Sequence, residues 1–451
     1  MNSRNKSICF WVAMFFLLQP DLRWASAESE RRPNIVVILS DDQGYGDLGI
    51  HGNPSIKTPN IDRLASEGVR IKDFYVSPLC SPTRASLLTG RYNHRTGVMW
   101  PARGGEVLRP RETTIAEVLK QAGYRTGIVG KWHLGRYNGY GPADQGFDEF
   151  FGFRDGMIDD YFDPVLEHNG KPVWTGGYVT DILTERAVKF IESNQSSPFF
   201  LYLAYNAPHV PSQAPQKYIE NYVKQGLPLS VAKLYGMVSC MDDGIGRVVD
   251  ALSRLGLEKD TAVFFLSDNG PHMESSTEYQ RFMSAESLKY DAMWRGTERF
   301  NANLRGEKGN LYEGGIKVPF IARWPAHFAK GRIADAMAAH LDLFPTILEL
   351  CNIPAPTRLK LDGKSMVSLL RHGEGAALHE KLFFWCDQVE PNRSDRLLYP
   401  QVNYAVRSGN WKLVKGKELY DLAQDPGRAS ESCRPPSANC CGTAKGIRTL
   451  G

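Results

Sequence analysis

Four short apolar runs without alternation constrain the fold of this chain most. They are rich in β-branched and aromatic residues and read NIVVIL, TGIVG, FFLYLAY and TAVFFL, at residues 34–39, 126–130, 199–205 and 261–266. A strand with one solvated face alternates apolar and polar residues, so these runs indicate strands covered on both faces. Helix-like stretches alternate with them, at residues 58–68, 114–123, 180–193 and 234–256. The order predicts an α/β fold with a large, mixed, mainly parallel sheet sandwiched by helices.

The two ends of the chain differ from this pattern. Residues 1–27 combine basic residues, the apolar run ICFWVAMFFLL and the small-residue end ASA, which predicts a signal peptide. The run is shorter than the roughly 20 residues that span a bilayer. We therefore expect export to a periplasmic, extracellular or lysosome-like compartment, and no stable membrane span after cleavage.

Beyond the expected signal peptide, we assign residues 28–375 to the α/β domain. Short strand-like segments such as KLFFWCD and ELYDL predict a small C-terminal antiparallel subdomain at residues 376–426. Residues 427–451 are poor in apolar residues and contain three cysteines, so we expect a disordered tail or one altered by a change of reading frame.

Charge and cysteine content exclude several classes of protein. Removing residues 1–27 takes three basic residues and one acidic residue, so the net charge falls from +4 to about +2. Without a long basic run, the chain has no electrostatic footprint for nucleic acid. Seven of the eight cysteines remain, an odd number at irregular spacing, which argues against a disulfide framework. The absence of a CxxC pair argues against a closed zinc site.

Polar residues that bind ions follow each apolar run. They are Asp41 and Asp42 after the first run, Lys131 and His133 after the second, His209 after the third, and Asp268 and Asn269 after the fourth. One such group alone would be an ordinary turn. Because parallel strands end at a common edge, four groups together predict one ligand cleft.

The residue types at this edge indicate its chemistry. The carboxylates and the amide offer hard oxygen ligands, which suit Ca²⁺ or Mg²⁺. Lys131 and His133 are two positions apart, so on an extended chain they point to the same side. Their shared position favours anion binding.

Cys80 precedes a predicted helix in the segment PLCSPTRASLLTGRY. A disulfide, a metal ligand and a small buried hydrophobe are its three ordinary roles. With Ser81 as the N-cap and Pro82 as the first helical residue, Cys80 would lie beside the positive end of the helix. Arg84 would add a positive charge in the same region. This arrangement suggests a nucleophile in a positively charged pocket beside a divalent cation.

The segment CSPTR followed by ASLLTGR resembles the type I sulfatase motif, Cys-x-Pro/Ala-x-Arg, in which the cysteine is converted to Cα-formylglycine. Other segments resemble sulfatases in the same order, among them PNIVVILSDDQGYGDLG, GYRTGIVGKWHLG, FLSDNGP and LRGEKGNLYEGGIKVPFIARWP. The resemblance covers nearly the whole mature chain. It implies an alkaline phosphatase-like fold and hydrolysis of sulfate esters, with a sulfated sugar or polysaccharide as the preferred substrate class.

The resemblance also implies roles for individual residues. The implied ligands of one Ca²⁺ are Asp41, Asp42, Asp268, Asn269 and the modified Cys80. Arg84 would hold and polarise the formylglycine. The residues implied to contact the sulfate or the leaving oxygen are Lys131, His133, His209 and Lys308, and a histidine near its ordinary pKa would protonate that oxygen. A formylglycine-generating enzyme would be the partner during maturation.

Some alternatives stay open. A phosphate or phosphonate ester hydrolase would share the sheet and the metal edge, and a catalytically silent glycan binder would fit a damaged C-terminus. Gly156 stands where such sulfatases often have a serine. The segments 154–178 and 271–303 would form the pocket walls. Aromatic residues of the second segment either stack on sugars or pack the loop on itself: Tyr279, Phe282, Tyr290, Trp294 and Phe300.

Overall fold

The computed structural model describes residues 32–101, 107–273, 299–375, 377–388 and 401–424. The expected signal peptide, the expected tail and four of the five aromatic residues of the 271–303 segment lie outside these ranges. Within the described ranges, no helix is both long enough and apolar enough to cross a membrane.

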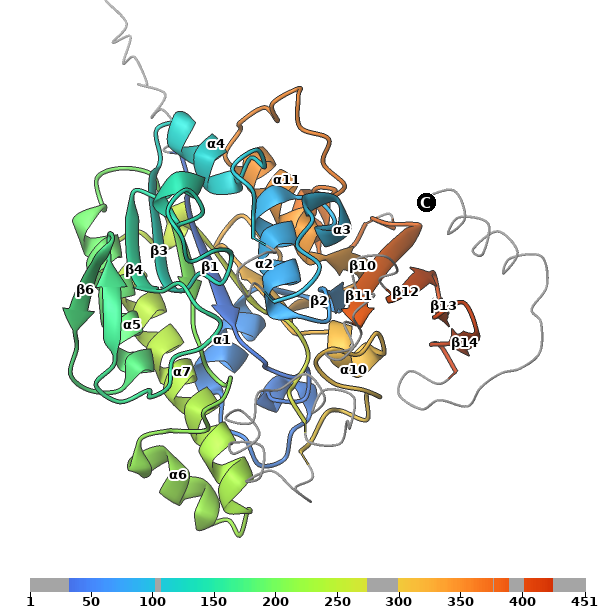
Figure 1. Cartoon of the computed structure of the whole chain (residues 1–451), viewed down its shortest axis with the longest axis horizontal. Helices are drawn as coiled ribbons and strands as arrows, with labels where there is room; N and C mark the ends of the chain where they lie inside the picture. Colours follow the sequence, from blue (N-terminus) through green and yellow to red (C-terminus); the bar gives the residue numbers. More distant parts are fainter. Residues whose placement is uncertain (1–31, 102–106, 274–298, 376, 389–400, 425–451) are drawn as a thin grey trace, which may run out of the picture. The chain divides into compact units, whose positions relative to one another are not determined.

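A ten-stranded mixed sheet forms the centre of the fold (Figure 1). In spatial order its strands are β10 (Arg332–Ala339), β2 (Val69–Tyr75), β9 (Phe320–Arg323), β8 (Thr261–Ser267), β1 (Asn34–Ser40), β7 (Phe199–Ala204), β3 (Arg125–Lys131), β4 (Glu149–Phe153), β5 (Val165–His168) and β6 (Lys171–Trp174). The five strands from β8 to β4 are parallel. The four predicted strands are β1, β3, β7 and β8, so the prediction of a mainly parallel central sheet is confirmed.

The middle residues of the central strands are apolar on both sides because both faces of these strands are covered. In β1, Ile35, Val37 and Leu39 belong to the hydrophobic core on one face. Val36 and Ile38 belong to the core on the opposite face. Every residue of β1, β7 and β8 is buried, so their continuous apolar character follows directly from their place in the middle layer.

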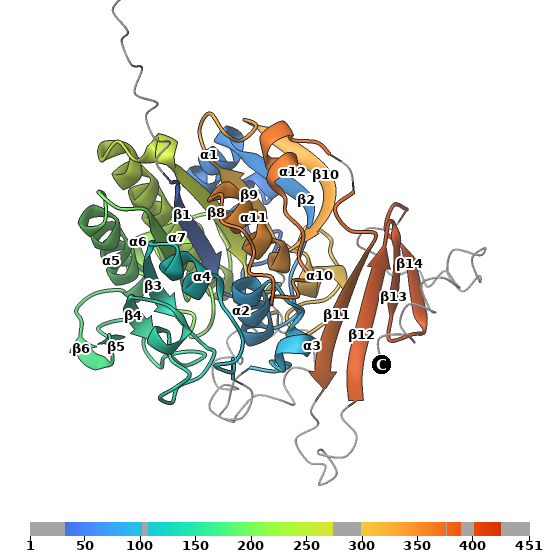
Figure 2. The same ribbon diagram turned by 90° about the horizontal axis from the view of Figure 1, so that it is seen from above.

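Helices cover both faces of the sheet (Figures 1 and 2). One face packs against α1 (Pro59–Glu67), α5 (Val179–Ser193), α6 (Gln216–Val223) and α7 (Leu229–Arg254). The other packs against α2 (Cys80–Thr89), α4 (Ile115–Gln121), α11 (Leu343–Leu350) and α12 (Val367–His372). The short helices are α3 (Asn93–Thr96), α10 (Glu313–Ile316), η1 (Gly49–His51), η2 (Ala143–Gln145), η3 (Glu258–Asp260) and η4 (His340–Asp342). The four predicted helices correspond to α1, α4, α5 and α7.

A second, four-stranded antiparallel sheet follows, as predicted. Its strands are β11 (Lys381–Gln388), β12 (Gln401–Ser408), β13 (Trp411–Val414) and β14 (Glu418–Asp421), in that spatial order (Figure 2). Ion pairs hold it to the larger domain: Lys412 Nζ lies 2.9 Å from Glu313 Oε1 in α10, and Arg407 Nη2 lies 2.8 Å from Asp73 Oδ2 in β2. Cys386 Sγ lies 3.4 Å from the carbonyl oxygen of Gly309, so β11 also contacts the loop that carries Lys308.

Candidate active site

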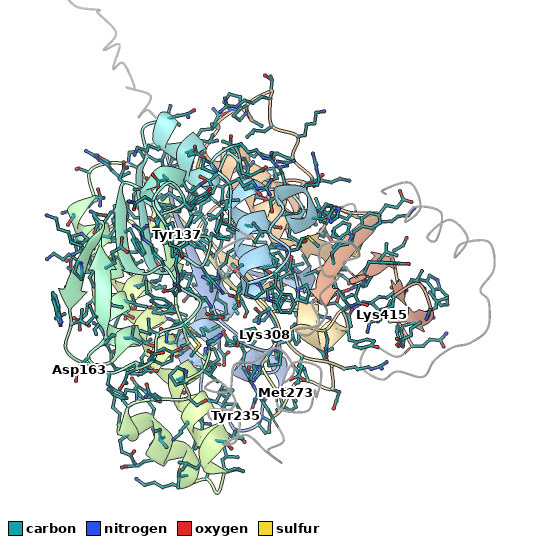
Figure 3. All side chains as sticks on the ribbon, viewed as in Figure 1. Tyr137, Asp163, Tyr235, Met273, Lys308 and Lys415 are labelled. Atoms are coloured by element: carbon teal, nitrogen blue, oxygen red, sulfur yellow. The ribbon has the colours of Figure 1, made fainter. Side chains whose placement is uncertain are left out.

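The structure brings all ten predicted site residues together at the carboxyl edge of the main sheet. They come from the ends of β1, β3, β7 and β8, from the start of α2, and from the loop that carries Lys308. Lys308, labelled in Figure 3, pairs with Asp42 beyond the end of β1. None of the ten is more than 9% exposed. Burial of so many polar side chains requires that their charges compensate one another.

Three carboxylates and three basic side chains provide this compensation. Lys308 Nζ lies 2.6 Å from Asp42 Oδ1, and Lys131 Nζ donates a hydrogen bond to Asp41 Oδ2. The Arg84 guanidinium donates to Asp268 Oδ2 through Nε at 3.0 Å and through Nη2 at 2.7 Å. Each acid therefore has a basic partner, and the resulting site is close to neutral.

The carboxylates are nevertheless crowded, and this crowding affects their ionisation. Burial would raise the pKa of Asp42, but Lys308 and His209 lower it overall. The pKa of Asp268 is raised by burial and by the neighbouring carboxylate of Asp41, and Arg84 only partly offsets both effects. A further positive charge in this position would relieve the repulsion between the acids.

The donor atoms fit a divalent cation. Among the described residues, the buried oxygens Asp41 Oδ1 and Asn269 Oδ1 accept no hydrogen bond. Single ligand atoms of Asp41, Asp42 and His209 lie within 4.8 Å of one another. Carboxylate and amide oxygens are the preferred ligands of Ca²⁺. The oxygens needed to hold such an ion are therefore present, and the His209 imidazole lies beside two of the carboxylates.

Cys80 occupies the start of α2, but not in the predicted way. The helix begins at Cys80 itself, after Leu79, and no side chain caps it. The prediction that Ser81 is the N-cap is wrong because the Ser81 hydroxyl donates instead to the carbonyl oxygen of His133, at 2.9 Å. Cys80 still lies at the positive end of the helix, and its Sγ is 3.3 Å from His133 Nδ1.

Cys80 forms no disulfide among the described residues, and its burial by itself fits the role of a small hydrophobe. Cys80 is a free cysteine, as are Cys240, Cys351 and Cys386, and all four are buried. Burial raises the pKa of the Cys80 thiol, although Lys131 and Lys308 act in the opposite direction. The unmodified side chain is therefore a thiol rather than a reactive thiolate.

The two histidines are held by backbone contacts and are neutral. His133 follows the end of β3 with a φ of 56°, so the extended geometry assumed for Lys131 and His133 is wrong, although both side chains reach the site. Burial and Lys131 lower the pKa of His133 well below its ordinary value. Burial and Lys308 lower the pKa of His209 to about 3. The expectation of an ordinary histidine pKa is therefore not met at either residue.

Gly156 makes room for the His133 imidazole. A Cβ atom at position 156 would lie 2.6 Å from His133 Nε2 and 2.7 Å from its Cε1. The ring is also fixed through its backbone, because His133 N donates to the carbonyl oxygen of Arg154 at 3.1 Å. The absence of a side chain at position 156 is thus the condition for placing this imidazole beside Cys80.

Sequence reasoning missed three residues that hold the site loops. Arg299 Nη2 donates to the carbonyl oxygen of Asp42 at 3.2 Å, and its Nε donates to Asp47 Oδ1 at 3.0 Å. The Tyr161 hydroxyl donates to the carbonyl oxygen of His209 at 3.1 Å. Asp47 lies in the acidic segment SDDQGYGD, so the sequence could have indicated that it belongs to the site. Arg299 and Tyr161 belong to no pattern, since their role depends on contacts with distant segments.

Comparisons with known proteins agree on one family. The sulfatase family model matches residues 33–353, and the model named N-sulphoglucosamine sulphohydrolase, C-terminal, matches residues 306–438. Human arylsulfatase A is 35% identical over 439 residues, which are 88% of this chain and 78% of that protein. Mouse N-acetylgalactosamine-6-sulfatase is 33% identical over 402 residues, 81% of this chain and 71% of that protein.

Solved structures extend the likeness to the whole fold. The crystal structure of Ps i-CgsB is 31% identical and covers 93% of both chains, with a TM-score of 0.80. The same protein has been solved in complex with k-i-k-neocarrahexaose, with a TM-score of 0.79 to this chain.

Replacing Gly156 tests the packing of His133. Gly156→Ser should destabilise the fold by about 1–3 kcal/mol, because the new side chain overlaps the imidazole in a packed site. Urea unfolding would measure the change in the free energy of unfolding. Gly176→Ser is the matched control: the nearest atom to a Cβ there is 3.9 Å away, so we expect a change within about 0.5 kcal/mol. Equal unfolding midpoints for Gly156→Ser and the native chain would contradict this account.

Proposed function

Because the chain belongs to the sulfatase family, it is a sulfuric ester hydrolase, and we propose that its nucleophile is a formylglycine made from Cys80. The position of Cys80 carries this proposal: it stands in the sequence CSPTR, at the start of α2, against His133 and near Lys131 and Lys308. The raised pKa of its thiol argues against direct attack by sulfur. When Cys80 carries an aldehyde, the hydrated form supplies one hydroxyl for attack on sulfur and a second that permits release of sulfate.

We propose that Asp41, Asp42, Asp268 and Asn269, together with the modified Cys80, hold one Ca²⁺. The two buried oxygens without a hydrogen-bond partner support this assignment. A bound Ca²⁺ would neutralise the crowded carboxylates and polarise the nucleophile and a sulfate oxygen.

Lys131 and Lys308 are the proposed sulfate-binding residues. Both ammonium groups are buried and pair with the carboxylates Asp41 and Asp42. If those carboxylates bind a cation, the two lysines become available to the oxygens of a sulfate group. Fixed positive charges in a buried site are well suited to stabilise negative charge that develops on an oxyanion.

The two histidines are assigned different proton transfers. His133 Nδ1 lies 3.3 Å from Cys80 Sγ, so it is placed to take a proton from the nucleophile. The His209 Nδ1–H donates to the carbonyl oxygen of Val210, which leaves Nε2 on the side of Asp42 and Lys308. Since Lys308 lowers the pKa of His209, an anion that pairs with this lysine would raise it again. His209 can then protonate the leaving oxygen of a bound ester.

Arg84 is the proposed support of the nucleophile. Its guanidinium is fully buried and donates to Asp268 and to the carbonyl oxygen of Lys131. It therefore links the start of α2 to the ends of β3 and β8. In this position it would hold and polarise the modified Cys80.

A sulfated sugar or polysaccharide is the proposed substrate class. N-acetylgalactosamine-6-sulfatase and the i-CgsB complex with neocarrahexaose support it, because these similar proteins act on or bind carbohydrates. We also propose export of the chain and maturation by a formylglycine-generating enzyme. Phosphate ester hydrolysis is the alternative that shares the cation and the lysines.

Peptide mass analysis tests the nucleophile. In protein co-expressed with a formylglycine-generating enzyme, the peptide that contains Cys80 should carry an aldehyde in place of the thiol. Cys80→Ala should lower kcat for a sulfate ester by roughly 10³-fold or more, as loss of a catalytic nucleophile does. Cys240→Ala, which removes a buried thiol outside the site, should retain kcat. A fully active protein with an unmodified Cys80 would refute the mechanism.

Removal of calcium tests the metal site. A chelator should abolish turnover, and Ca²⁺ should restore it. Ca²⁺ at 100 times its Kd should also stabilise the fold by about 2.7 kcal/mol, measured by thermal unfolding. Asn269→Ala should require roughly tenfold more Ca²⁺ for the same stabilisation. Asn34→Ala is the control, since Asn34 is equally buried at the opposite end of β1. An identical calcium response of both variants would argue against Asn269 as a ligand.

A substrate panel tests the reaction and the substrate class. We expect the highest kcat/KM for a sulfated mono- or oligosaccharide, a lower value for a simple aryl sulfate and the lowest for the matching aryl phosphate. Faster cleavage of the phosphate would favour the alternative. Turnover of aryl sulfate without turnover of any sulfated sugar would refute the substrate class while leaving the sulfatase activity intact.

A further inference from the structure

A second concentration of positive charge lies outside the active site. A pocket of about 440 Å³ opens between the end of α2, the segment before α4 and residues 358–360. Five basic side chains line it: Arg91, Arg95, Arg111, Arg358 and Lys360. Only two carboxylates, those of Glu112 and Glu117, line it with them. The lining therefore carries an excess of three positive charges.

Ion pairs within the structure neutralise only some of the positive charges of the pocket. Arg91 pairs with Glu112, and Arg95 pairs with Asp362. Arg111 lies 3.9 Å from Glu112, a carboxylate that Arg91 already uses. The Glu117 carboxylate accepts a hydrogen bond from Thr114 N at 2.7 Å as part of the cap of α4.

Of the five basic side chains of the pocket, Arg358 and Lys360 are the two without a carboxylate partner among the described residues. No carboxylate of the described residues lies within ion-pair distance of either side chain, and both are exposed. Two free cations in a concave site beside three further arginines attract and concentrate anions. An arginine guanidinium can also bind an oxyanion such as sulfate or phosphate through two parallel hydrogen bonds.

The pocket is separate from the active site. Cys80 begins α2 and Arg91 lies two residues beyond its end, and a helix of ten residues is about 15 Å long. None of the ten active-site residues lines the pocket. Figure 1 shows α2 leading from the loops at the carboxyl edge of the sheet to α3, where the pocket lies.

We propose that this pocket is a second anion site, which binds a sulfated residue of a polymeric substrate while another sulfate of the same chain occupies the active site. This assignment rests on the proposed carbohydrate substrate. The volume lies within the range of small-molecule sites, so the pocket has room for a sulfated sugar rather than for an ion alone. Simultaneous contact at two sites increases the affinity for long chains and leaves short substrates unaffected.

Binding measurements in a Cys80→Ala background test the proposal without turnover. The probes are a size-fractionated sulfated polysaccharide, its desulfated form, inorganic sulfate and inorganic phosphate. Arg358→Ser combined with Lys360→Ser should weaken binding of the long sulfated chain by roughly tenfold or more, through the loss of charge-assisted contacts. Binding of a sulfated disaccharide, which is too short to reach both sites, should stay unchanged.

The matched control is Lys330→Ser combined with Arg371→Ser. This pair removes one exposed lysine and one exposed arginine that line neither site. Equal losses for the two double variants would reduce the effect to net charge and overturn the site. Unchanged binding of the long chain would overturn it as well. If the pocket variant lost only inorganic sulfate or phosphate, the pocket would be a free-ion site and the polymer assignment would be wrong.

Kinetics separate this proposal from the proposed function. With Cys80 intact, the pocket variant should raise KM for the long chain by roughly tenfold, and kcat/KM for an aryl sulfate should not change. If the native enzyme cleaved no sulfated sugar, the substrate class would fail whatever the pocket binds. If the native enzyme cleaved long and short sulfated chains, and the pocket variant had the same kinetic constants for both, the second site would be refuted while the proposed function would stand.

Discussion

The balance of buried charge at the carboxyl edge of the main sheet is the interaction on which the rest of the site depends. Asp41, Asp42 and Asp268 each lie against a basic side chain. Removing one partner from a buried pair typically costs 3–5 kcal/mol, because an uncompensated charge remains, so the six groups stabilise one another only as a set. Such a set can exchange partners: a cation can take the carboxylates and an anion can take the lysines with little change in net charge.

The same charges affect the ionisation of the two histidines. Lys131 and Lys308 help to keep His133 and His209 neutral. In the proposed mechanism, an anionic ester that pairs with the lysines would weaken this effect and favour protonation of a histidine. Under the proposed mechanism, substrate binding and acid catalysis would be linked through these two lysine charges.

The helix α2 lies between the two anion-binding sites proposed for this chain. Its first residue is Cys80, which lies against His133, and the basic pocket begins just beyond its last residue. Since a helix is a rigid element of defined length, it sets the separation between a sulfate in the active site and a sulfate in the pocket. The proposed second site therefore requires a long sulfated chain, because a single sulfated sugar is shorter than this helix.

The sequence by itself determined the central strands and the composition of the site. The run at residues 35–39, apolar at every position, fits a strand covered on both faces, and parallel strands place their carboxyl ends at one edge. That reasoning was sufficient to bring Asp41, Lys131 and Asp268 into one cleft. The short motif around Cys80 was equally informative, because a modification sequence is read locally along the chain.

Only the tertiary structure decided which of these groups touch. Ser81 bonds the carbonyl oxygen of His133 instead of capping α2, and Arg299 reaches Asp42 across the site, because both contacts join segments far apart in the sequence. Gly156 is the clearest case. The sequence shows a missing side chain, whereas the fold shows that an imidazole, 2.6 Å from where the Cβ would lie, occupies its space.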